Sequence, residues 1–139
     1  MHSFGYKQQE IADALHISQQ LLPEWYDWNT TRTYCLQYGA DLPIIRNQAE
    51  NNAIKKLAIF NEWDHFFLGL MNVNLDGNWV WIQDGSLANY TNWVPSQPDI
   101  NNVIAGYYST DEIECCSAGQ WYSFALDDMI PGLCAMHAF

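Results

Sequence analysis

Residues 79–99 read WVWIQDGSLANYTNWVPSQPD, and this stretch decides the fold. Its first four residues follow the triplet Asp76-Gly77-Asn78, a combination that predicts a tight turn leading into a short strand. From Gln83 to Glu112 almost every residue favours loops, so we expect no regular structure there. A loop of that length is uncommon inside a compact domain unless it carries the function.

Upstream of this stretch, a helix is predicted to follow Trp28. Asn29 or Thr30 can cap it, because either side chain can accept hydrogen bonds from the free N–H groups of a first helical turn. Gly39 can adopt the left-handed conformation that ends a helix. We expect this helix to present Cys35 to the core.

The remaining segments predict one more helix and several strands. A helix is expected from about Asn47 to Phe60, because apolar residues recur there at three- and four-residue steps. The apolar run Phe66–Leu70 predicts a strand. Further strands are expected at about Ile113–Cys116, Trp121–Phe124 and Gly132–His137. The pattern thus changes from helical to strand-like after the second helix.

Charge is distributed unevenly along the chain. The 5 Lys or Arg and 16 Asp or Glu give a formal net charge of -11, and no Lys or Arg follows Lys56. The acids in that second part are Glu62, Asp64, Asp76, Asp84, Asp99, Asp111, Glu112, Glu114, Asp127 and Asp128. Binding to nucleic acid or to anionic lipid is excluded, because both need clustered Lys and Arg. The acidic part must tolerate its own repulsion, meet a cationic partner or hold metal ions.

Length and composition predict a single domain over residues 1–139, with residues 1–14 as a possible N-terminal extension. An aromatic content of 15% excludes a disordered acidic chain, since such chains are poor in aromatic residues. No apolar run approaches the roughly 18 residues that span a bilayer. Without a recognisable signal segment, the protein is expected to be cytosolic or a mature secreted form. The even number of widely separated cysteines favours the secreted form.

Several features, taken in order, resemble the C-type lectin-like domain family. The matching pieces are Trp28 with Cys35, Gly39-Ala40-Asp41-Leu42, Glu50-Asn51, Phe67-Leu68-Gly69-Leu70, residues 79–86, Tyr90 to Trp93, Gln97-Pro98-Asp99 and Leu133-Cys134. The resemblance covers nearly everything from about Leu15 onward. Each piece alone is weak, but the ordered set is specific.

The resemblance implies an α+β fold, in which two helices flank small antiparallel sheets, the first and last strands pair, and a long ligand-binding loop projects from one end. It also implies a disulfide between Cys35 and Cys134, a kind of bond that typically contributes about 2–4 kcal/mol in a small domain. Cys115 and Cys116 then lack an obvious partner. They are left to bond to each other, to a second chain, or to stay as thiols.

The tripeptide Gln97-Pro98-Asp99 is the candidate binding motif. In the family this version goes with galactose-type ligands, so the resemblance implies a calcium-dependent lectin for galactose or N-acetylgalactosamine. The chemistry agrees, because an amide oxygen and a carboxylate flank the proline, a cis peptide would turn both toward one point, and calcium prefers such oxygen donors. Glu114 is the predicted third residue for both the ion and the sugar. An ordinary surface turn is the alternative.

The sequence departs from the family where the second half of a calcium site is expected. The family places Asn and Asp after the tryptophan of the following strand, but here Trp121 is followed by Tyr122 and Ser123. Losing a carboxylate should weaken calcium binding strongly, since ligand charge controls affinity. The alternative is therefore a metal-free interaction module that binds a protein partner or dimerises through Cys115 or Cys116.

Tyr107 and Tyr108 are candidates for sugar contacts, because their rings offer the flat apolar face on which galactose stacks. The alternative is that they pack the loop against Trp93. The four tryptophans expected in the core are Trp79, Trp81, Trp93 and Trp121.

An enzyme is the weakest interpretation. The sequence contains no recognisable nucleophile motif and no His-rich metal signature. We therefore predict a secreted lectin whose partners are glycans with terminal galactose or N-acetylgalactosamine, and which neither binds nucleic acid nor inserts into a membrane.

Overall fold

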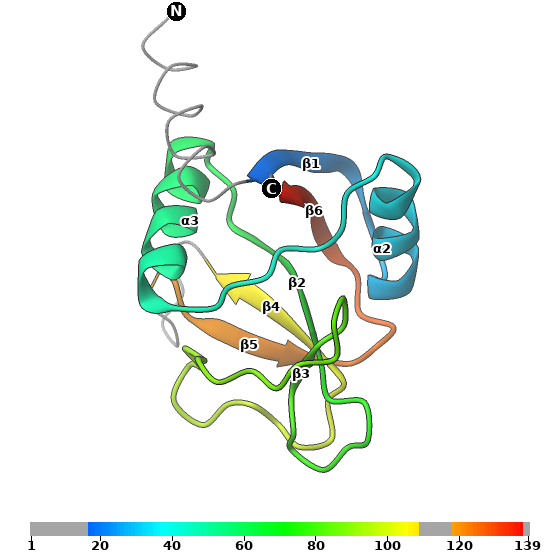
Figure 1. Cartoon of the computed structure of the whole chain (residues 1–139), viewed down its shortest axis with the longest axis vertical. Helices are drawn as coiled ribbons and strands as arrows, with labels where there is room; N and C mark the ends of the chain where they lie inside the picture. The colour runs from blue at the N-terminus through cyan, green and yellow to red at the C-terminus, as the bar shows by residue number, and fades with distance from the viewer. Residues whose placement is uncertain (1–16, 109–117, 138–139) are drawn as a thin grey trace, which may run out of the picture.

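The computed structural model describes residues 17–108 and 118–137 (Figure 1). The elements in chain order are β1 (Ile17–Tyr26), α2 (Trp28–Gln37), α3 (Gln48–Phe60), β2 (His65–Met71), β3 (Val80–Trp81), β4 (Ile104–Tyr108), β5 (Trp121–Phe124) and β6 (Ile130–His137). One antiparallel sheet pairs β1 with β6, and the other has the order β3-β2-β4-β5. The α+β class, the two helices and the pairing of the first and last strands are confirmed.

The first helix starts from a different cap than the sequence predicts. Asp27 is the N-cap of α2, because its Oδ1 accepts a hydrogen bond from the N–H of Thr30 at 2.8 Å. Asn29 and Thr30 already lie inside the helix, so the prediction that one of them caps it is wrong. Gly39, with φ at +72°, follows the helix in the left-handed conformation as expected.

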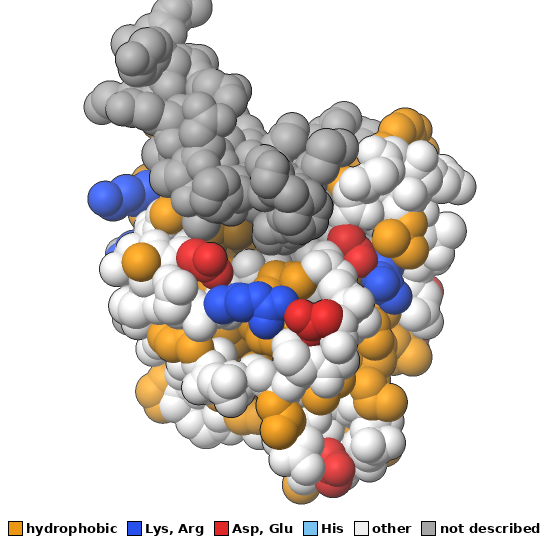
Figure 2. All heavy atoms as spheres, viewed as in Figure 1, with side chains coloured by type: hydrophobic (Ala, Val, Ile, Leu, Met, Phe, Trp, Pro, Cys, Tyr) orange, Lys and Arg blue, Asp and Glu red, His pale blue; other side chains and the backbone are white. Residues whose placement is uncertain are grey.

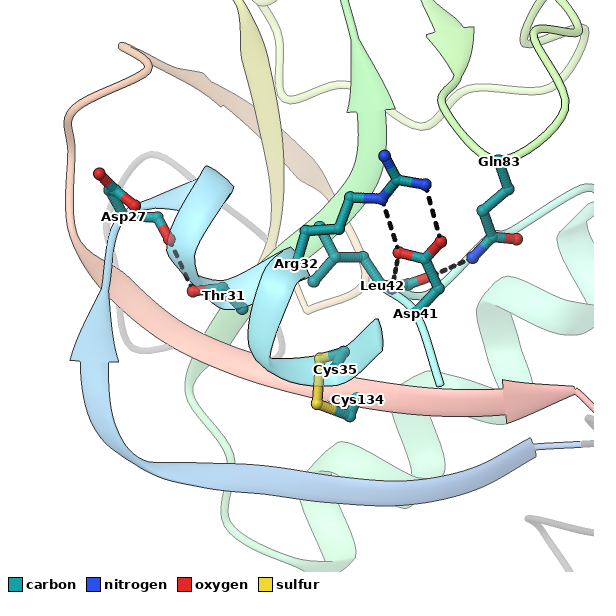
Figure 3. Close-up of a disulfide and its surroundings, with 8 residues drawn as sticks. All are labelled: Asp27, Thr31, Arg32, Cys35, Asp41, Leu42, Gln83 and Cys134. Carbon is teal, nitrogen blue, oxygen red and sulfur yellow. Dashed lines mark hydrogen bonds and ion pairs between the residues drawn. A yellow bond between two sulfur atoms is a disulfide. The ribbon is translucent and has the colours of Figure 1, made fainter. Parts of the chain in front are cut away.

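A disulfide joins α2 to β6 (Figure 3). Cys35 and Cys134 are bonded across a sequence separation of 99, which confirms the pairing that the resemblance implies. Nearby, Arg32 donates two hydrogen bonds to the carboxylate of Asp41, at 3.0 and 3.1 Å. The same carboxylate accepts from the N–H of Leu42 at 2.8 Å, so α2 and the segment that follows it are fixed to one another.

Two clusters of buried side chains fill the interior. The larger contains Trp79, Trp81 and Trp121 and is lined by α3, and Trp93 packs against it partly buried. The smaller surrounds Cys35 and Cys134 between α2, β1 and β6. The expected core positions of the tryptophans are therefore confirmed. No helix in residues 17–108 and 118–137 is long and apolar enough to cross a bilayer.

The segment expected to be irregular contains a strand. β4 lies inside residues 83–112 and pairs with β2 on one side and β5 on the other. Local propensity missed it because its stability comes from these long-range pairings, and Gly106 and Ala105 are weak strand formers on their own. The strand expected at Ile113–Cys116 lies outside the described residues.

Part of the charge asymmetry is neutralised by the fold. Arg46, from the half that holds all cations, lies 2.6 Å from the carboxylate of Asp84 in the acidic half. Hydrogen bonds from the hydroxyl and the N–H of Ser86 lower the pKa of Asp84 to about 2, and the hydrogen bond and charge of Arg46 contribute less. Figure 2 shows the result on one face, where basic and acidic side chains lie next to each other among scattered hydrophobic ones.

Candidate functional site

The loop that carries Gln97-Pro98-Asp99 lies along the edge strand β5. The N–H of Val94 donates to the carbonyl of Trp121 at 2.9 Å, and the N–H of Val103 donates to the carbonyl of Phe124 at 3.2 Å. The loop is thus tethered to β5 at both of its ends. The Gln97–Pro98 peptide bond is cis.

Ser123 is the centre of a hydrogen-bond network between this loop and β5. Its Oγ donates to Oε1 of Gln97 at 2.6 Å and accepts from the N–H of Asp99 at 2.9 Å. Its backbone N–H donates to the same Oε1 at 3.1 Å, and Nδ2 of Asn102 donates to Oγ at 3.2 Å. Ser123 is only 1% exposed, so these bonds are shielded from water and strengthened.

Asn72 holds the loop from the other side. This buried side chain follows β2, and its Nδ2 donates to the carbonyls of Ile100 and Asn102, each at 3.3 Å. Its Oδ1 accepts from the N–H of Gly77 at 3.1 Å, and its own N–H donates to the carbonyl of Val103 at 2.8 Å. Sequence patterns alone do not single out Asn72; its signal is an asparagine placed directly after the buried apolar strand β2.

The donors that the structure describes around Ser123 are too few for a calcium ion. Calcium needs six to eight oxygen ligands, and its affinity depends on how many of them are charged. Oε1 of Gln97 already accepts two hydrogen bonds from Ser123. Asp99 is exposed, and its Oδ1 accepts from the N–H of Asn101 at 2.9 Å. Across residues 17–108 and 118–137, no three His, Cys, Asp or Glu side chains gather as a metal site would require.

The two tyrosines predicted to contact sugar point in opposite directions. Tyr107 is fully buried, its hydroxyl donates to the carbonyl of Asn51 at 2.9 Å, and burial raises its pKa. A ring enclosed in this way cannot lie against a ligand, so the prediction for Tyr107 is wrong. Tyr108 is partly exposed, and desolvation raises its pKa. Since side chains alternate along a strand, Tyr108 faces away from the side that carries Ser123.

Asn51 fixes β5, and with it Ser123, to helix α3. Its Oδ1 accepts from the indole N–H of Trp121 at 2.9 Å, and its Nδ2 donates to the carbonyl of Gly119 at 3.0 Å. Asn51 is buried, so both bonds are made away from water. The strand that presents Ser123 therefore has a rigid support.

Three residues of the predicted site lie outside the described residues: Glu114, Cys115 and Cys116. The roles predicted for them, as a ligand of calcium and sugar and as cysteines for a second bond, remain predictions.

Comparison with known proteins identifies the family. A family model described as the Lectin C-type domain matches residues 24–134. The chain is 31% identical over 120 residues to human C-type mannose receptor 2; the match covers 83% of this chain but only 7% of the receptor's length.

Solved structures show the same fold. The carbohydrate-recognition domain of the mouse scavenger receptor C-type lectin superposes with a TM-score of 0.73 at 24% identity, covering 89% of this chain and 91% of that one. A calcium-independent type II antifreeze protein superposes with a TM-score of 0.70 at 18% identity, covering 89% and 88%. From the end of β1 to the disulfide in β6, this chain belongs to the C-type lectin domain family.

Proposed function

We propose that this chain is a carbohydrate-binding module whose ligand-binding loop is held without calcium. The observation that carries the proposal is the hydrogen bond from Oγ of Ser123 to Oε1 of Gln97 at 2.6 Å. In a calcium site that amide oxygen would be directed to the ion. Here the hydroxyl hydrogen of Ser123 lies where the ion would be. The expected activity is binding rather than catalysis.

The comparisons support both parts of this proposal. The scavenger receptor domain with this fold is a carbohydrate-recognition domain, and the mannose receptor is a relative in sequence. The antifreeze protein with the same fold is calcium-independent, so the fold does not depend on the ion. A module that keeps the family's loop and replaces its metal with hydrogen bonds is consistent with both.

Recognition would use a loop that is ordered before the ligand arrives. Ser123 and Asn72 fix the loop backbone from two sides, which lowers the entropic cost of ordering it on binding. The exposed carboxylate of Asp99, oriented by the N–H of Asn101, can accept hydrogen bonds from sugar hydroxyls.

Calorimetric titration with calcium tests this function, combined with thermal melting in calcium and in EDTA. We expect no heat of calcium binding and the same melting midpoint in both buffers, because an ion that binds the native state would raise the midpoint. Retention on galactose-agarose and mannose-agarose is expected to be insensitive to EDTA. A calcium-dependent rise in the midpoint, or elution by EDTA, contradicts the proposal.

Calcium-dependent binding of galactose or N-acetylgalactosamine is the second candidate. The Gln97-Pro98-Asp99 tripeptide beside β5 and the exposed carboxylate of Asp99 favour it. The ion would then be held by Gln97, Asp99 and Glu114, and Ser123 would have to release the amide oxygen of Gln97. The same calcium titration separates the two candidates.

We also propose that the protein is secreted and forms one domain over residues 1–139, with residues 1–14 as an extension. Dimerisation through Cys115 or Cys116, or binding of a protein partner, belongs to the metal-free alternative. Non-reducing electrophoresis tests the dimer, since a band at twice the mass of 16.0 kDa that reducing agent removes is expected only if an interchain bond forms.

A further inference from the structure

Aromatic side chains form a continuous row that runs from β1 onto the four-stranded sheet, on the face that points away from Ser123. The row consists of Trp25, His65, Tyr108, Tyr122 and Phe124, contributed by β1, β2, β4 and β5. Ring centroids lie 5.6 Å apart from Trp25 to His65, 5.5 Å from His65 to Tyr108, 5.8 Å from Tyr108 to Tyr122 and 5.6 Å from Tyr122 to Phe124. His65 and Tyr108 are also cross-strand neighbours, so the pairing of β2 with β4 builds the centre of the row.

The geometry of the ring contacts leaves aromatic faces open. Trp25 meets His65 at 87° and Tyr122 meets Tyr108 at 82°, whereas His65 and Tyr108 stack nearly parallel at 7° and cover each other's facing ring surfaces. Edge-to-face contacts of this kind use the face of only one of the two rings. Trp25 is 57% exposed, and the other four side chains are partly exposed. The row therefore offers apolar ring surface together with an imidazole and two phenol hydroxyls.

The row is also uncharged. The six strands within residues 17–108 and 118–137 contain no Lys or Arg, and β2, β4 and β5 contain no Asp or Glu. Glu24 on β1 accepts a hydrogen bond from the hydroxyl of Tyr26, at 3.1 Å. An anionic ligand would find no counter-charge on these strands. The complementary partner is a neutral molecule with both apolar faces and hydroxyl groups.

We propose that this aromatic row binds a neutral oligosaccharide, with one pyranose ring on the open face of Trp25 and sugar hydroxyls hydrogen-bonded to His65, Tyr108 and Tyr122. The inference rests on the proposed function, because it names where a calcium-independent glycan module takes its ligand. Ligand sites commonly combine aromatic lining with a few polar groups, as this row does.

One substitution links the row to the altered loop. Tyr122 stands where the resemblance expects an asparagine that would coordinate calcium. The same residue contacts Tyr108 and Phe124 and so extends the row along β5. The change that removes a metal ligand therefore adds an aromatic ring to a second surface.

A second group of tyrosines, two of them exposed, provides a matched control. Tyr26, Tyr34 and Tyr38 stack beside α2 with interplanar angles of 22° and 29°. Both contacts in this group are stacked and cover ring faces, whereas in the row only the contact between His65 and Tyr108 is stacked. Tyr38 is 67% exposed, and its replacement is not expected to disturb the core.

Affinity electrophoresis of the full chain tests the proposal, in native gels that contain galactomannan, mannan or β-glucan, all neutral polysaccharides, with EDTA present. We expect at least one of them to retard the wild type, and Trp25→Ala and Tyr122→Ala to weaken that retardation at least tenfold. Tyr38→Ala should behave like the wild type. Near-UV circular dichroism and melting verify folding. Tyr122→Phe keeps the ring but loses the hydroxyl, so its retardation should fall between that of the wild type and that of Tyr122→Ala.

The outcomes separate this proposal from the function on which it rests. Retardation that survives EDTA but does not respond to Trp25→Ala overturns the row while leaving calcium-independent binding intact. Retardation that requires calcium overturns calcium-independent binding. If none of the three polysaccharides retards the wild type in EDTA or in calcium, the row as a binding site for neutral polysaccharide is overturned, while the melting data still decide the calcium question.

Discussion

Oγ of Ser123 lies 2.6 Å from Oε1 of Gln97, which joins residues 26 positions apart in the sequence through a buried hydrogen bond. The hydroxyl also accepts from the N–H of Asp99, so one small side chain satisfies groups on both sides of Pro98. A cation would perform the same task by attracting oxygen atoms. Here the hydroxyl of Ser123, which both donates and accepts a hydrogen bond, performs this task without the carboxylates that a cation requires.

Replacing Ser123 with alanine should destabilise the loop and the domain. The variant leaves Oε1 of Gln97 and the N–H of Asp99 without their shared partner in a buried place, a loss worth about 1–3 kcal/mol. Urea denaturation measures it. Thr91→Ala, an exposed position before the same loop, should change the free energy of unfolding little. Equal effects of the two substitutions would show that the bond contributes nothing.

Restoring the family's pair should create a response to calcium. The double variant Tyr122→Asn with Ser123→Asp places a carboxylate beside Gln97 and Asp99 and an amide at the preceding position of β5. Without calcium we expect it to melt below the wild type, because a buried carboxylate then faces the amide oxygen of Gln97. Calcium should raise its melting midpoint and leave that of the wild type unchanged. A variant that ignores calcium would indicate that further ligands are missing.

Asn72 should be required for the shape of the loop as well as for stability. Asn72→Ala removes the hydrogen bonds that this buried side chain makes to the carbonyls of Ile100 and Asn102 and to the N–H of Gly77. We expect a loss of about 2–4 kcal/mol in urea denaturation, since several groups lose their partner together. Asn74→Ala, an exposed neighbour on the same turn, is the control. Similar losses in both variants would contradict the role of Asn72.

Much of the fold follows from local patterns, whereas the details of the site depend on distant contacts. Apolar periodicity predicts α3 within one residue, and the order of motifs predicts the Cys35–Cys134 bond. β4 could not be predicted locally, since pairing with β2 and β5 stabilises it. The sequence shows that a carboxylate is missing at position 123. The hydrogen bond that Ser123 forms in its place could not be predicted, because it requires the loop with Gln97 to fold back onto β5.

The aromatic row was hidden from the sequence for the same reason. Trp25, His65 and Tyr108 lie on three strands separated by long segments; pairing of β2 with β4 joins His65 to Tyr108, and packing of the two-stranded sheet against them adds Trp25. Tyr107 and Tyr108 look equivalent as neighbours in the sequence. Alternation along β4 buries the first and leaves the second on the row, so choosing between them requires the direction in which the strand faces.

His65 should make the domain less stable in mild acid. Desolvation lowers its pKa in the folded protein, and Asp64 offsets this only partly. The unfolded chain, with an imidazole pKa of about 6.5, therefore binds a proton before the folded one does, and stability falls as the pH drops below that value. Melting midpoints from pH 7.5 to 5 measure this decline. His65→Phe keeps an aromatic ring in the row and should flatten the curve; an unchanged slope would assign the effect to other groups.

Any side chain at Gly132 should lower the stability of the domain, because α2 lies directly on β6 at this position. A Cβ at this position would lie 2.3 Å from Cγ2 of Thr31 and 3.2 Å from Cδ1 of Leu22. Gly132→Ala is therefore expected to cost about 1–3 kcal/mol through overpacking. Thr31→Ser removes Cγ2 but keeps a hydroxyl able to donate to the carbonyl of Asp27, as Oγ1 of Thr31 does at 2.7 Å. In that background Gly132→Ala should cost less, and a double-mutant cycle by urea denaturation measures the difference. Equal costs in both backgrounds would mean that Thr31 is not what excludes a side chain from this contact.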